Sequence, residues 1–334
     1  MKRIAINGFG RIGRVAFRII KNRSDIEVVA INDLSSPDHL AYLLKYDSVH
    51  GRFPGKVEFN AEGFVVDGKL IHVSAEKDPA NLPWKSLEID VVLESTGHFQ
   101  CKDKSSVHCK AGAKKVLITA PTSGVAPDAT ICYGVNNQVY NPSMEVVSTA
   151  SCTTNCIAPV AKILNDSFGI EKASVTTIHS YTKDQHLLDS AHKDKRRSRA
   201  AAVSMIPTTT GAAKAVALVL PELAGKFDGM AIRVPTPNVS CIDLVAVLKK
   251  NTSVEEVNAK FKEASHAVFK GILGFEEDPV VSIDMVGTNE SSIVDAGCTR
   301  VLGGNMVKII SWYDNEWGFG NRAVDLLSMM AKSC

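Results

Sequence analysis

Two cysteines placed one helical turn apart have the clearest capacity for covalent chemistry in this sequence. Cys152 and Cys156 belong to the segment STASCTTNC at 148–156, which leads into the apolar run 157–164. Because Ser151 is a suitable helix N-cap, Cys152 is predicted in the first helical turn, where free N–H groups and the helix dipole lower a thiol pKa. Cys156 is expected to be buried and inert, so Cys152 is the candidate nucleophile. A packing role for both sulfurs is the alternative, and no metal site is predicted, because two cysteines alone leave zinc half coordinated.

A thiolate that attacks a carbonyl group needs a partner that accepts and returns a proton. His179, one of nine histidines, is the best placed, since it ends the strand-like run 173–178 and opens onto the loop Ser180-Tyr181-Thr182. The residues alone leave a structural role for His179 equally open. Cys152 and His179 are therefore the candidate nucleophile and base.

Glycines and an acidic residue near the start of the chain predict a dinucleotide site. Gly8, Gly10 and Gly13 form a GxGxxG motif, whose glycines permit a tight turn and close approach of the backbone to a pyrophosphate. Asp33 follows 20 residues after Gly13, where its carboxylate can accept hydrogen bonds from an adenosine ribose and repel the 2′-phosphate of NADP. A turn role for Asp33 is the alternative. NAD is predicted, and a hemithioacetal on Cys152 can donate a hydride to its nicotinamide ring.

The elements that must position these residues divide the chain into two patterns. In the first third, strand-like runs with little alternation surround a helix-like stretch, which indicates parallel strands with both sheet faces covered. The strand-like runs are 3–6, 27–31, 89–93 and 116–119, and the helix-like stretch is 11–21. The predicted fold class is α/β, with a Rossmann-type doubly wound parallel sheet.

From Ser151 onward the pattern changes to longer alternating runs, at 239–248 and 306–313, that are typical of antiparallel strands with one helix-covered face. A second, α+β domain with a mainly antiparallel sheet is predicted. The stretch 316–332 predicts a final amphipathic helix.

Length and composition restrict the class of protein. The 334 residues suggest about two domains, and 45% apolar with 22% charged residues is typical of a globular enzyme. A net charge of +2 is too small to gather nucleic acid or a membrane surface. Eight cysteines without a CxxC pair predict reduced thiols. Because no secretory leader or apolar span is recognisable, a cytoplasmic location is expected.

Five stretches in order along the chain resemble the phosphorylating glyceraldehyde-3-phosphate dehydrogenase family, over essentially the whole length. They are INGFGRIGR at 6–14, KYDSVHG at 45–51, ASCTTNC at 150–156, PTTTGAA at 207–213 and WYDNEWG at 312–318. The resemblance implies a homotetramer with NAD as cofactor. It also implies an NAD-binding domain at 1–150, completed by the C-terminal helix at 316–334, and a catalytic domain at 151–315.

The resemblance further implies the reaction and the residues that carry it. Cys152 would form a hemithioacetal with D-glyceraldehyde 3-phosphate and then a thioester, with His179 as base and oxyanion stabiliser, and inorganic phosphate would release 1,3-bisphosphoglycerate. The substrate phosphate would be held by Thr182 and Arg233, and the attacking phosphate by Ser151, Thr153, Arg197, Thr210 and Gly211. Guanidinium groups, hydroxyls and a helix N-terminus suit phosphate. Additional cofactor ligands would be Arg11, Ile12, Lys77, Thr119 and, beside the nicotinamide carboxamide, Asn315.

Two stretches leave specificity and partners open. Ser190-Ala191 stands where many NAD-specific members of the family have Leu-Pro and is similar to members that accept NADP, whereas Asp33 and Leu34 favour NAD. We expect NAD preference with some NADP tolerance. The basic run 193–199 is either a solvated charged face or a nucleic-acid patch. Anion binding by Arg197 is favoured, because no aromatic residues interleave the basic ones, and nucleic acid is not expected as the primary partner.

Three alternative functions remain at this point. Erythrose-4-phosphate dehydrogenase has a similar framework but hydrolyses its thioester with water, so phosphate dependence distinguishes the two. A binding or adhesion protein would keep the fold and lose the catalytic residues, which are present here. A cysteine hydrolase would leave the dinucleotide motif without a role.

Overall fold

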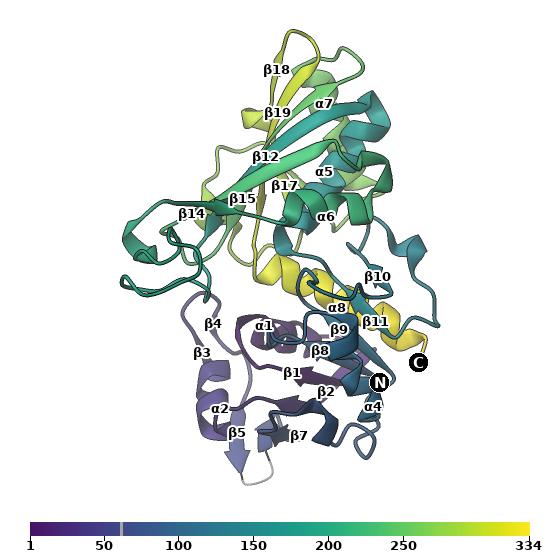
Figure 1. Ribbon diagram of the computed structural model, residues 1–334, viewed down its shortest axis with the longest axis vertical. Helices are drawn as coiled ribbons and strands as arrows, with labels where there is room; N and C mark the ends of the chain where they lie inside the picture. Colours follow the sequence, from purple (N-terminus) through teal and green to yellow (C-terminus); the bar gives the residue numbers. More distant parts are fainter. Residues whose placement is uncertain (61–62) are drawn as a thin grey trace. The chain divides into compact units, whose positions relative to one another are not determined.

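The computed structural model describes residues 1–60 and 63–334, which form two compact units (Figure 1). Unit 1 consists of Met1–Tyr133, Asn137–Ala150 and Gly320–Cys334, and unit 2 of Gly134–Asn136 and Ser151–Phe319. The change of unit after Ala150 coincides with the change of sequence pattern at Ser151. The last helix begins in unit 2, and its residues from Gly320 onward belong to unit 1.

Within the described residues, a nine-stranded sheet forms the centre of unit 1. Its order is β10-β11-β9-β8-β1-β2-β7-β6-β5. The strands are β1 Lys2–Asn7, β2 Ile26–Asn32, β5 Val57–Asn60, β6 Gly63–Val66, β7 Lys69–Ser74, β8 Val91–Glu94, β9 Lys115–Ile118, β10 Ala129–Thr130 and β11 Val146–Ser148. Strands from β10 to β7 are parallel, and β6 and β5 add an antiparallel edge. The order reverses at β1, so the carboxyl ends of β1 and β8 form the switch point where ligands bind in such sheets.

Helices and a small hairpin complete unit 1. The helices are α1 Arg11–Ile20, α2 Pro37–Lys45, α3 Lys102–Ser105, α4 Val107–Lys110 and the greater part of α8 Trp317–Lys332, with 3-10 turns η1 Pro79–Asn81 and η2 Asn137–Val139 and the hairpin β3 Tyr46–Asp47 with β4 Gly51–Arg52. Helix α8 packs closely on α1, because a Cβ at Gly320 would lie 2.6 Å from Val15 Cγ1. The chain ends also meet within this unit, where Lys2 Nζ donates to the Cys334 carbonyl oxygen at 2.6 Å.

Unit 2 is built on a second, mainly antiparallel sheet. In the described chain its order is β13-β14-β12-β15-β19-β17-β16, with β18 paired to β19. The strands are β12 Ile170–Ser180, β13 Ile206–Thr209, β14 Phe227–Val234, β15 Ser240–Leu248, β16 Leu273–Glu276, β17 Ser292–Asp295, β18 Arg300–Leu302 and β19 Met306–Tyr313. The pairs β12–β14 and β16–β17 are parallel.

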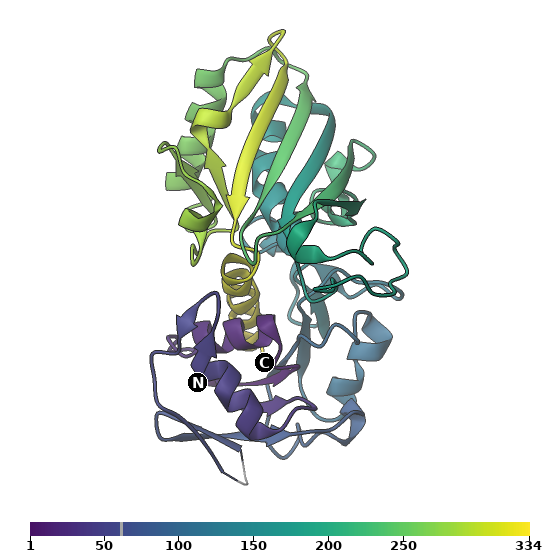
Figure 2. The ribbon, with the colours of Figure 1, turned by 90° about the vertical axis from the view of Figure 1, so that its left-hand side faces the viewer.

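One face of this sheet is covered by helices (Figure 2). They are α5 Cys152–Phe168, α6 Ala212–Val219 and α7 Val254–His266, and short 3-10 turns lie at η3 Ala201–Val203, η4 Pro221–Leu223, η5 Ser282–Met285 and η6 Ala296–Cys298. Helix α5 contacts β12, β15, β17 and β19 and both other helices. This central helix carries the candidate nucleophile at its first residue.

The predicted fold class is confirmed, and the predicted strands and helices occur with small shifts at their ends. The structure adds an antiparallel edge, β5 and β6, to the predicted parallel sheet. Strands β10 and β11 were not predicted, because two or three residues are too few to show a periodicity. Across residues 1–60 and 63–334, we find no helix with both the length and the apolar character that crossing a membrane requires.

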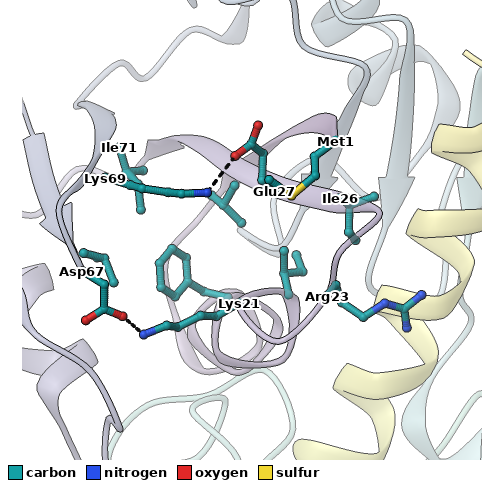
Figure 3. A pocket seen from close by; sticks show the side chains of 12 residues that line it. Met1, Lys21, Arg23, Ile26, Glu27, Asp67, Lys69 and Ile71 are labelled. Atoms are coloured by element: carbon teal, nitrogen blue, oxygen red, sulfur yellow. Dashed lines mark ion pairs between the residues drawn. The ribbon is translucent and has the colours of Figure 1, made fainter.

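A pocket at the carboxyl end of α1 lies away from the switch point of the sheet (Figure 3). Its base is apolar, and its charged rim is paired internally. Lys21 pairs with Asp67, and Lys69 Nζ lies 3.5 Å from Glu27 Oε2. Because these charges satisfy each other, the pocket has little with which to select a charged ligand.

Candidate active site

Helix α5 begins at Cys152, with Ser151 as its N-cap. Ser151 Oγ accepts a hydrogen bond from the Thr154 backbone N–H at 3.0 Å and lies 2.7 Å from Thr154 Oγ1. Just before the cap, Ala150 has a φ of 59°, a conformation that residues with a Cβ rarely adopt. The cap and the position of Cys152 in the first turn are thus as predicted.

His179 lies on β12, directly beside Arg233 on β14, because the parallel register pairs these two residues. Cys152 Sγ lies 3.5 Å from His179 Nε2. On the other side of the ring, His179 Nδ1 lies 2.7 Å from the Ser180 carbonyl oxygen and 2.7 Å from Arg233 Nη1. Arg233 Nη1 also donates to that carbonyl oxygen at 3.0 Å. The fold therefore brings the predicted nucleophile and base, Cys152 and His179, into one contact group with Arg233, which the family resemblance implied.

Burial decides the protonation of this group. Burial, reinforced by the Arg233 charge, lowers the pKa of His179 to about 3, so the imidazole is neutral near pH 7. Burial also raises the pKa of the Cys152 thiol, and Arg233 opposes that rise. The prediction of a lowered thiol pKa is wrong in direction, because loss of water disfavours the thiolate more than the helix N-terminus favours it. A neutral thiol beside a neutral imidazole results. Because the same shift makes the imidazole a weaker base, proton transfer must accompany the attack of the sulfur and not precede it.

Tyr313, which the sequence did not single out, supports the first turn of α5. Its hydroxyl lies 2.8 Å from Thr153 Oγ1 and 2.8 Å from Thr177 Oγ1. Its ring packs edge-on against His179, with centroids 6.0 Å apart. The alternation of 306–313 was a signal for this position, since it places Tyr313 on the same sheet face as Val307 and Ile309, all three of which are buried.

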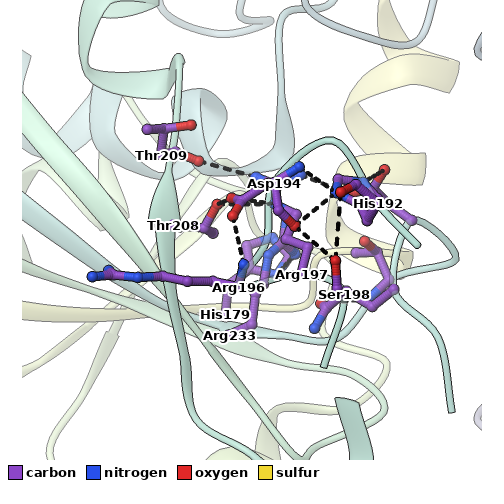
Figure 4. A network of polar contacts seen from close by, with 12 residues as sticks. His179, His192, Asp194, Arg196, Arg197, Ser198, Thr208, Thr209 and Arg233 are labelled. Carbon is purple, nitrogen blue, oxygen red and sulfur yellow. Dashed lines mark hydrogen bonds and ion pairs between the residues drawn. The ribbon is translucent and has the colours of Figure 1, made fainter. Parts of the chain in front are cut away.

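Figure 4 shows Arg197 in a polar network drawn together with His179 and Arg233. Arg197 Nε donates to Thr208 Oγ1 at 2.9 Å, its Nη1 to Asp184 Oδ2 at 2.6 Å and its Nη2 to the Thr209 carbonyl oxygen at 3.1 Å. Thr208 Oγ1 in turn donates to Asp194 Oδ2 at 2.7 Å. The guanidinium is held in a fixed orientation, and its charge contributes to the lowered pKa of His179.

The other residues implied in phosphate binding lie on loops and helix starts of unit 2. Gly211 is the N-cap of α6, and Thr210 Oγ1 accepts from the Ala212 backbone N–H at 3.2 Å. Thr182 lies in the turn after β12, where its carbonyl oxygen accepts from the Gln185 N–H at 2.9 Å. The roles of these residues, and of Ser151, Thr153 and Arg197, stay predictions.

The glycine motif of unit 1 has the geometry that a dinucleotide requires. Gly8 has a φ of 91°, and a Cβ there would lie 2.7 Å from the Thr96 backbone nitrogen. A Cβ at Gly13 would lie 2.2 Å from the Gly8 carbonyl oxygen, and Gly10 is the N-cap of α1. The strand β2 ends just before Asp33, whose Oδ2 accepts from the Phe9 N–H at 2.8 Å. The turn, the helix N-terminus and the carboxylate thus lie together at the switch point.

The other predicted cofactor ligands lie in unit 1, except Asn315, which lies in unit 2. Ile12 lies in the first turn of α1, and Arg11 Nη1 is bound to Asp47 Oδ2 at 2.5 Å. Thr119 Oγ1 donates to the Glu94 carbonyl oxygen at 3.0 Å, and Lys77 is exposed. Asn315 lies in unit 2, immediately after β19. Their contacts with a cofactor stay predictions.

A buried chain of polar groups beneath the glycine turn was not predicted. Trp84 Nε1 can only donate, so His108 Nδ1 accepts at 2.9 Å and His108 Nε2 carries the hydrogen that faces Glu94 Oε2 at 3.2 Å. Asn7 Nδ2 donates to the same Oε2 at 2.6 Å, and the Thr96 N–H donates to Glu94 Oε1 at 2.8 Å. Glu94 is only 2% exposed, so its carboxylate is a buried acceptor for donors from β1, α4 and its own loop.

Comparison with known proteins gives matches over both units. A family model described as glyceraldehyde 3-phosphate dehydrogenase, NAD binding domain, matches residues 2–102, and one described as glyceraldehyde 3-phosphate dehydrogenase, C-terminal domain, matches residues 151–315. Similar relatives are glyceraldehyde-3-phosphate dehydrogenase of Geobacillus stearothermophilus, 56% identical over 98% of each chain, and that of Thermotoga maritima, 58% identical over 99% of this chain and 100% of the relative. Glyceraldehyde-3-phosphate dehydrogenase 1 of Bacillus subtilis is 55% identical over 99% of this chain and 98% of its own.

Proposed function

The chain belongs to the glyceraldehyde-3-phosphate dehydrogenase family of NAD-dependent oxidoreductases, and on this premise we propose that it oxidises D-glyceraldehyde 3-phosphate to 1,3-bisphosphoglycerate with inorganic phosphate. The observation that carries the proposal is the 3.5 Å contact between Cys152 Sγ and the Nε2 of a neutral His179. In this arrangement one sulfur and one base are prepared for attack on an aldehyde.

The first step joins the substrate to the protein. His179 Nε2 takes the thiol proton while Cys152 Sγ forms a bond to the aldehyde carbon, and it then returns that proton to the former carbonyl oxygen, giving a hemithioacetal. For this, His179 Nδ1 must carry a hydrogen that the Ser180 carbonyl oxygen accepts at 2.7 Å. Arg233 Nη1, which can only donate, must then direct its hydrogen to that carbonyl oxygen at 3.0 Å and not to Nδ1. Because the imidazole is neutral near pH 7, it can accept the proton without first losing one.

Oxidation and release complete the cycle. NAD, when bound, would supply the hydride acceptor, its nicotinamide ring. His179 takes the hydroxyl proton of the hemithioacetal as its carbon becomes the thioester carbonyl. An oxygen of inorganic phosphate then attacks that carbonyl, the carbon–sulfur bond breaks, and the acyl phosphate leaves while the Cys152 sulfur takes back a proton from His179. We assign the attacking phosphate to Ser151, Thr153, Arg197, Thr210 and Gly211, which supply hydroxyls, a guanidinium and helix N-termini.

The substrate phosphate is assigned to Thr182 and Arg233. Support comes from the Arg233 guanidinium, whose Nε is buried and has no partner within the described chain. Such a donor is costly to leave unpaired, and a phosphate oxygen would satisfy its guanidinium group through a charge-assisted hydrogen bond.

The cofactor assignment follows the geometry of the glycine turn. We assign the pyrophosphate to the turn at Gly8, Gly10 and Gly13 and the first N–H groups of α1, and the adenosine ribose to Asp33. Unit 1 is then the NAD-binding domain and unit 2 the catalytic domain. The homotetramer, the cytoplasmic location and the partial tolerance of NADP remain predictions from the sequence.

Phosphate dependence tests the proposal. NADH formation from glyceraldehyde 3-phosphate is measured by absorbance with and without inorganic phosphate, and with erythrose 4-phosphate as a second substrate. We expect sustained turnover only with glyceraldehyde 3-phosphate and phosphate together. Turnover that is indifferent to phosphate, or faster with erythrose 4-phosphate, would instead support erythrose-4-phosphate dehydrogenase. The names of the relatives favour the first outcome.

A further inference from the structure

The backbone of Asn315 is held in one conformation by its neighbour Asp314. Asp314 Oδ1 accepts from the Glu316 N–H at 2.9 Å and the Trp317 N–H at 2.7 Å, and Oδ2 accepts from the Gly287 N–H at 2.8 Å. Asn315 itself is 7% exposed. A polar side chain that is fixed and almost buried must satisfy its amide group with defined partners.

Two serines provide those partners for the amide oxygen. Ser180 Oγ, at the end of β12, and Ser240 Oγ, at the start of β15, each donate to Asn315 Oδ1 at 2.9 Å. Ser240 Oγ also accepts from the Ser180 N–H at 3.1 Å. Ser180 is 0% and Ser240 2% exposed, so neither hydroxyl can turn to water instead.

The two hydroxyl hydrogens fix which end of the amide faces them. If the amide were reversed, Asn315 Nδ2 would face both serines, and two buried hydroxyl hydrogens would lose their acceptor. The orientation with Oδ1 toward the serines satisfies both of them. It leaves Asn315 Nδ2, which has no partner among the residues that the structure describes, turned away from the serines as a donor.

We propose that Ser180 and Ser240 are positioning residues that lock the Asn315 amide so that its Nδ2 donates to the carbonyl oxygen of the nicotinamide carboxamide. The inference rests on the proposed role of Asn315 beside that group and adds the polarity of the contact and its cause. Two short side chains would then dictate which end of a carboxamide is recognised.

A cofactor analogue with a ketone in place of the carboxamide can distinguish the two orientations of the Asn315 amide. Nicotinamide can turn its own N–H₂ toward a reversed Asn315, but the 3-acetylpyridine ring has only a carbonyl oxygen, which a reversed Asn315 Oδ1 repels. Dissociation constants of NAD and of 3-acetylpyridine adenine dinucleotide are measured by calorimetry on the full chain and on the S180A/S240A double variant. We expect the preference for NAD over the analogue to rise about three- to tenfold in the variant.

A matched serine separates orientation from stability. Ser311 is also fully buried, on β19 itself, and its Oγ contacts Ser292 Oγ at 2.7 Å. S311A should leave the ratio of the two dissociation constants unchanged. The ratio does not depend on the folded fraction of a sample, and S180A alone, which keeps Ser240, should shift it less but in the same direction.

The inference is overturned if the double variant, or S180A where the double variant fails to fold, keeps the parent ratio or lowers it, or if S311A changes the ratio equally. Cofactor binding is measured without substrate. Failure of the phosphate-dependent activity would therefore remove the proposed reaction and leave this test of Asn315 intact.

Discussion

Cys152 and Cys156 differ only by one helical turn, yet their surroundings separate their roles. Cys152 is partly exposed and faces His179. Cys156 is fully buried, its Sγ lies 3.3 Å from Ser292 Oγ, and burial raises the pKa of its thiol strongly.

We expect Cys152→Ala to lower kcat by about four orders of magnitude or more while the dissociation constant for NAD stays near that of the parent. Removal of the nucleophile leaves His179 no sulfur to deprotonate. The matched variant Cys156→Ala should keep kcat within about threefold and lose about 1 kcal/mol of unfolding free energy. Equal losses of activity in the two variants, measured as NADH formation, would contradict the assignment of the nucleophile.

His179 predicts a specific dependence of stability on pH. Its pKa is lowered to about 3 in the folded chain, against the ordinary value of 6.5. Below pH 6.5 the unfolded chain binds a proton that the folded chain refuses, so the contribution of neutral His179 is present above that pH and is lost as pH falls toward 3. Thermal unfolding of the parent should therefore lose more stability between pH 7.5 and pH 5 than that of His179→Asn. Parallel pH profiles for the two proteins would show that the ring is not held neutral.

At the residue scale, the sequence located the nucleophile because a cap serine and an apolar run define a helix start locally. It could not give the direction of the thiol pKa, which depends on how many distant residues cover Cys152. The partners of Tyr313 were hidden for the same reason: Thr153 and Thr177 lie far from it in the chain, and only strand register brings them together.

Among elements, β12 and β14 show how the site arises from strand register. Their parallel pairing sets His179 beside Arg233, two residues whose separation of 54 positions carries no local signal. The long alternating runs predicted β15 and β19 because periodicity accumulates over eight or nine residues. The parallel pairing within a mainly antiparallel sheet depends on the crossover between strands, which the side-chain pattern does not encode.

The buried Glu94 links three elements and predicts a large effect of a small change. In Glu94→Gln one carboxylate oxygen becomes an N–H₂ group, which must face donors from Asn7 and His108 or from Thr96. We expect a loss of about 3 kcal/mol of unfolding free energy, because buried donors are left without an acceptor. The measurement is urea unfolding at neutral pH.

The control for this change is Glu58→Gln, since the Glu58 side chain is 54% exposed in its ion pair with Lys56. That variant should stay within about 0.5 kcal/mol of the parent. A similar small effect at both positions would mean that water reaches the Glu94 carboxylate.

At the scale of the whole molecule, the C-terminal residues are needed to complete unit 1, although most of that unit lies at the start of the chain. Residues from Gly320 onward complete unit 1, where Arg23 Nη1 donates to Asp325 Oδ1 at 2.9 Å and Tyr140 OH lies 2.7 Å from Ser333 Oγ. The apolar face of α8 is fully buried, as Leu326 and Leu327 show with 0% exposure each. The final helix is therefore a core element of the first unit.

We expect a chain truncated after Phe319 to lose NAD binding, because unit 1 is left without one wall of its apolar core. Calorimetric titration with NAD measures this directly. The control is Lys332→Ala on the same helix, whose side chain is 70% exposed and which should bind NAD as the parent does. Undiminished affinity in the truncated chain would mean that the glycine turn does not need the helix.

The return of the C-terminus to unit 1 also orders events on the ribosome. Translation delivers the N-terminal residues first, yet Gly320–Cys334 emerges only after every residue of unit 2 has been made. Unit 2 can complete its own apolar core while unit 1, although synthesised largely before it, still lacks Gly320–Cys334. The nascent chain consequently cannot complete the core of unit 1 until Gly320–Cys334 has been made, so NAD can stabilise the complete unit only after that point.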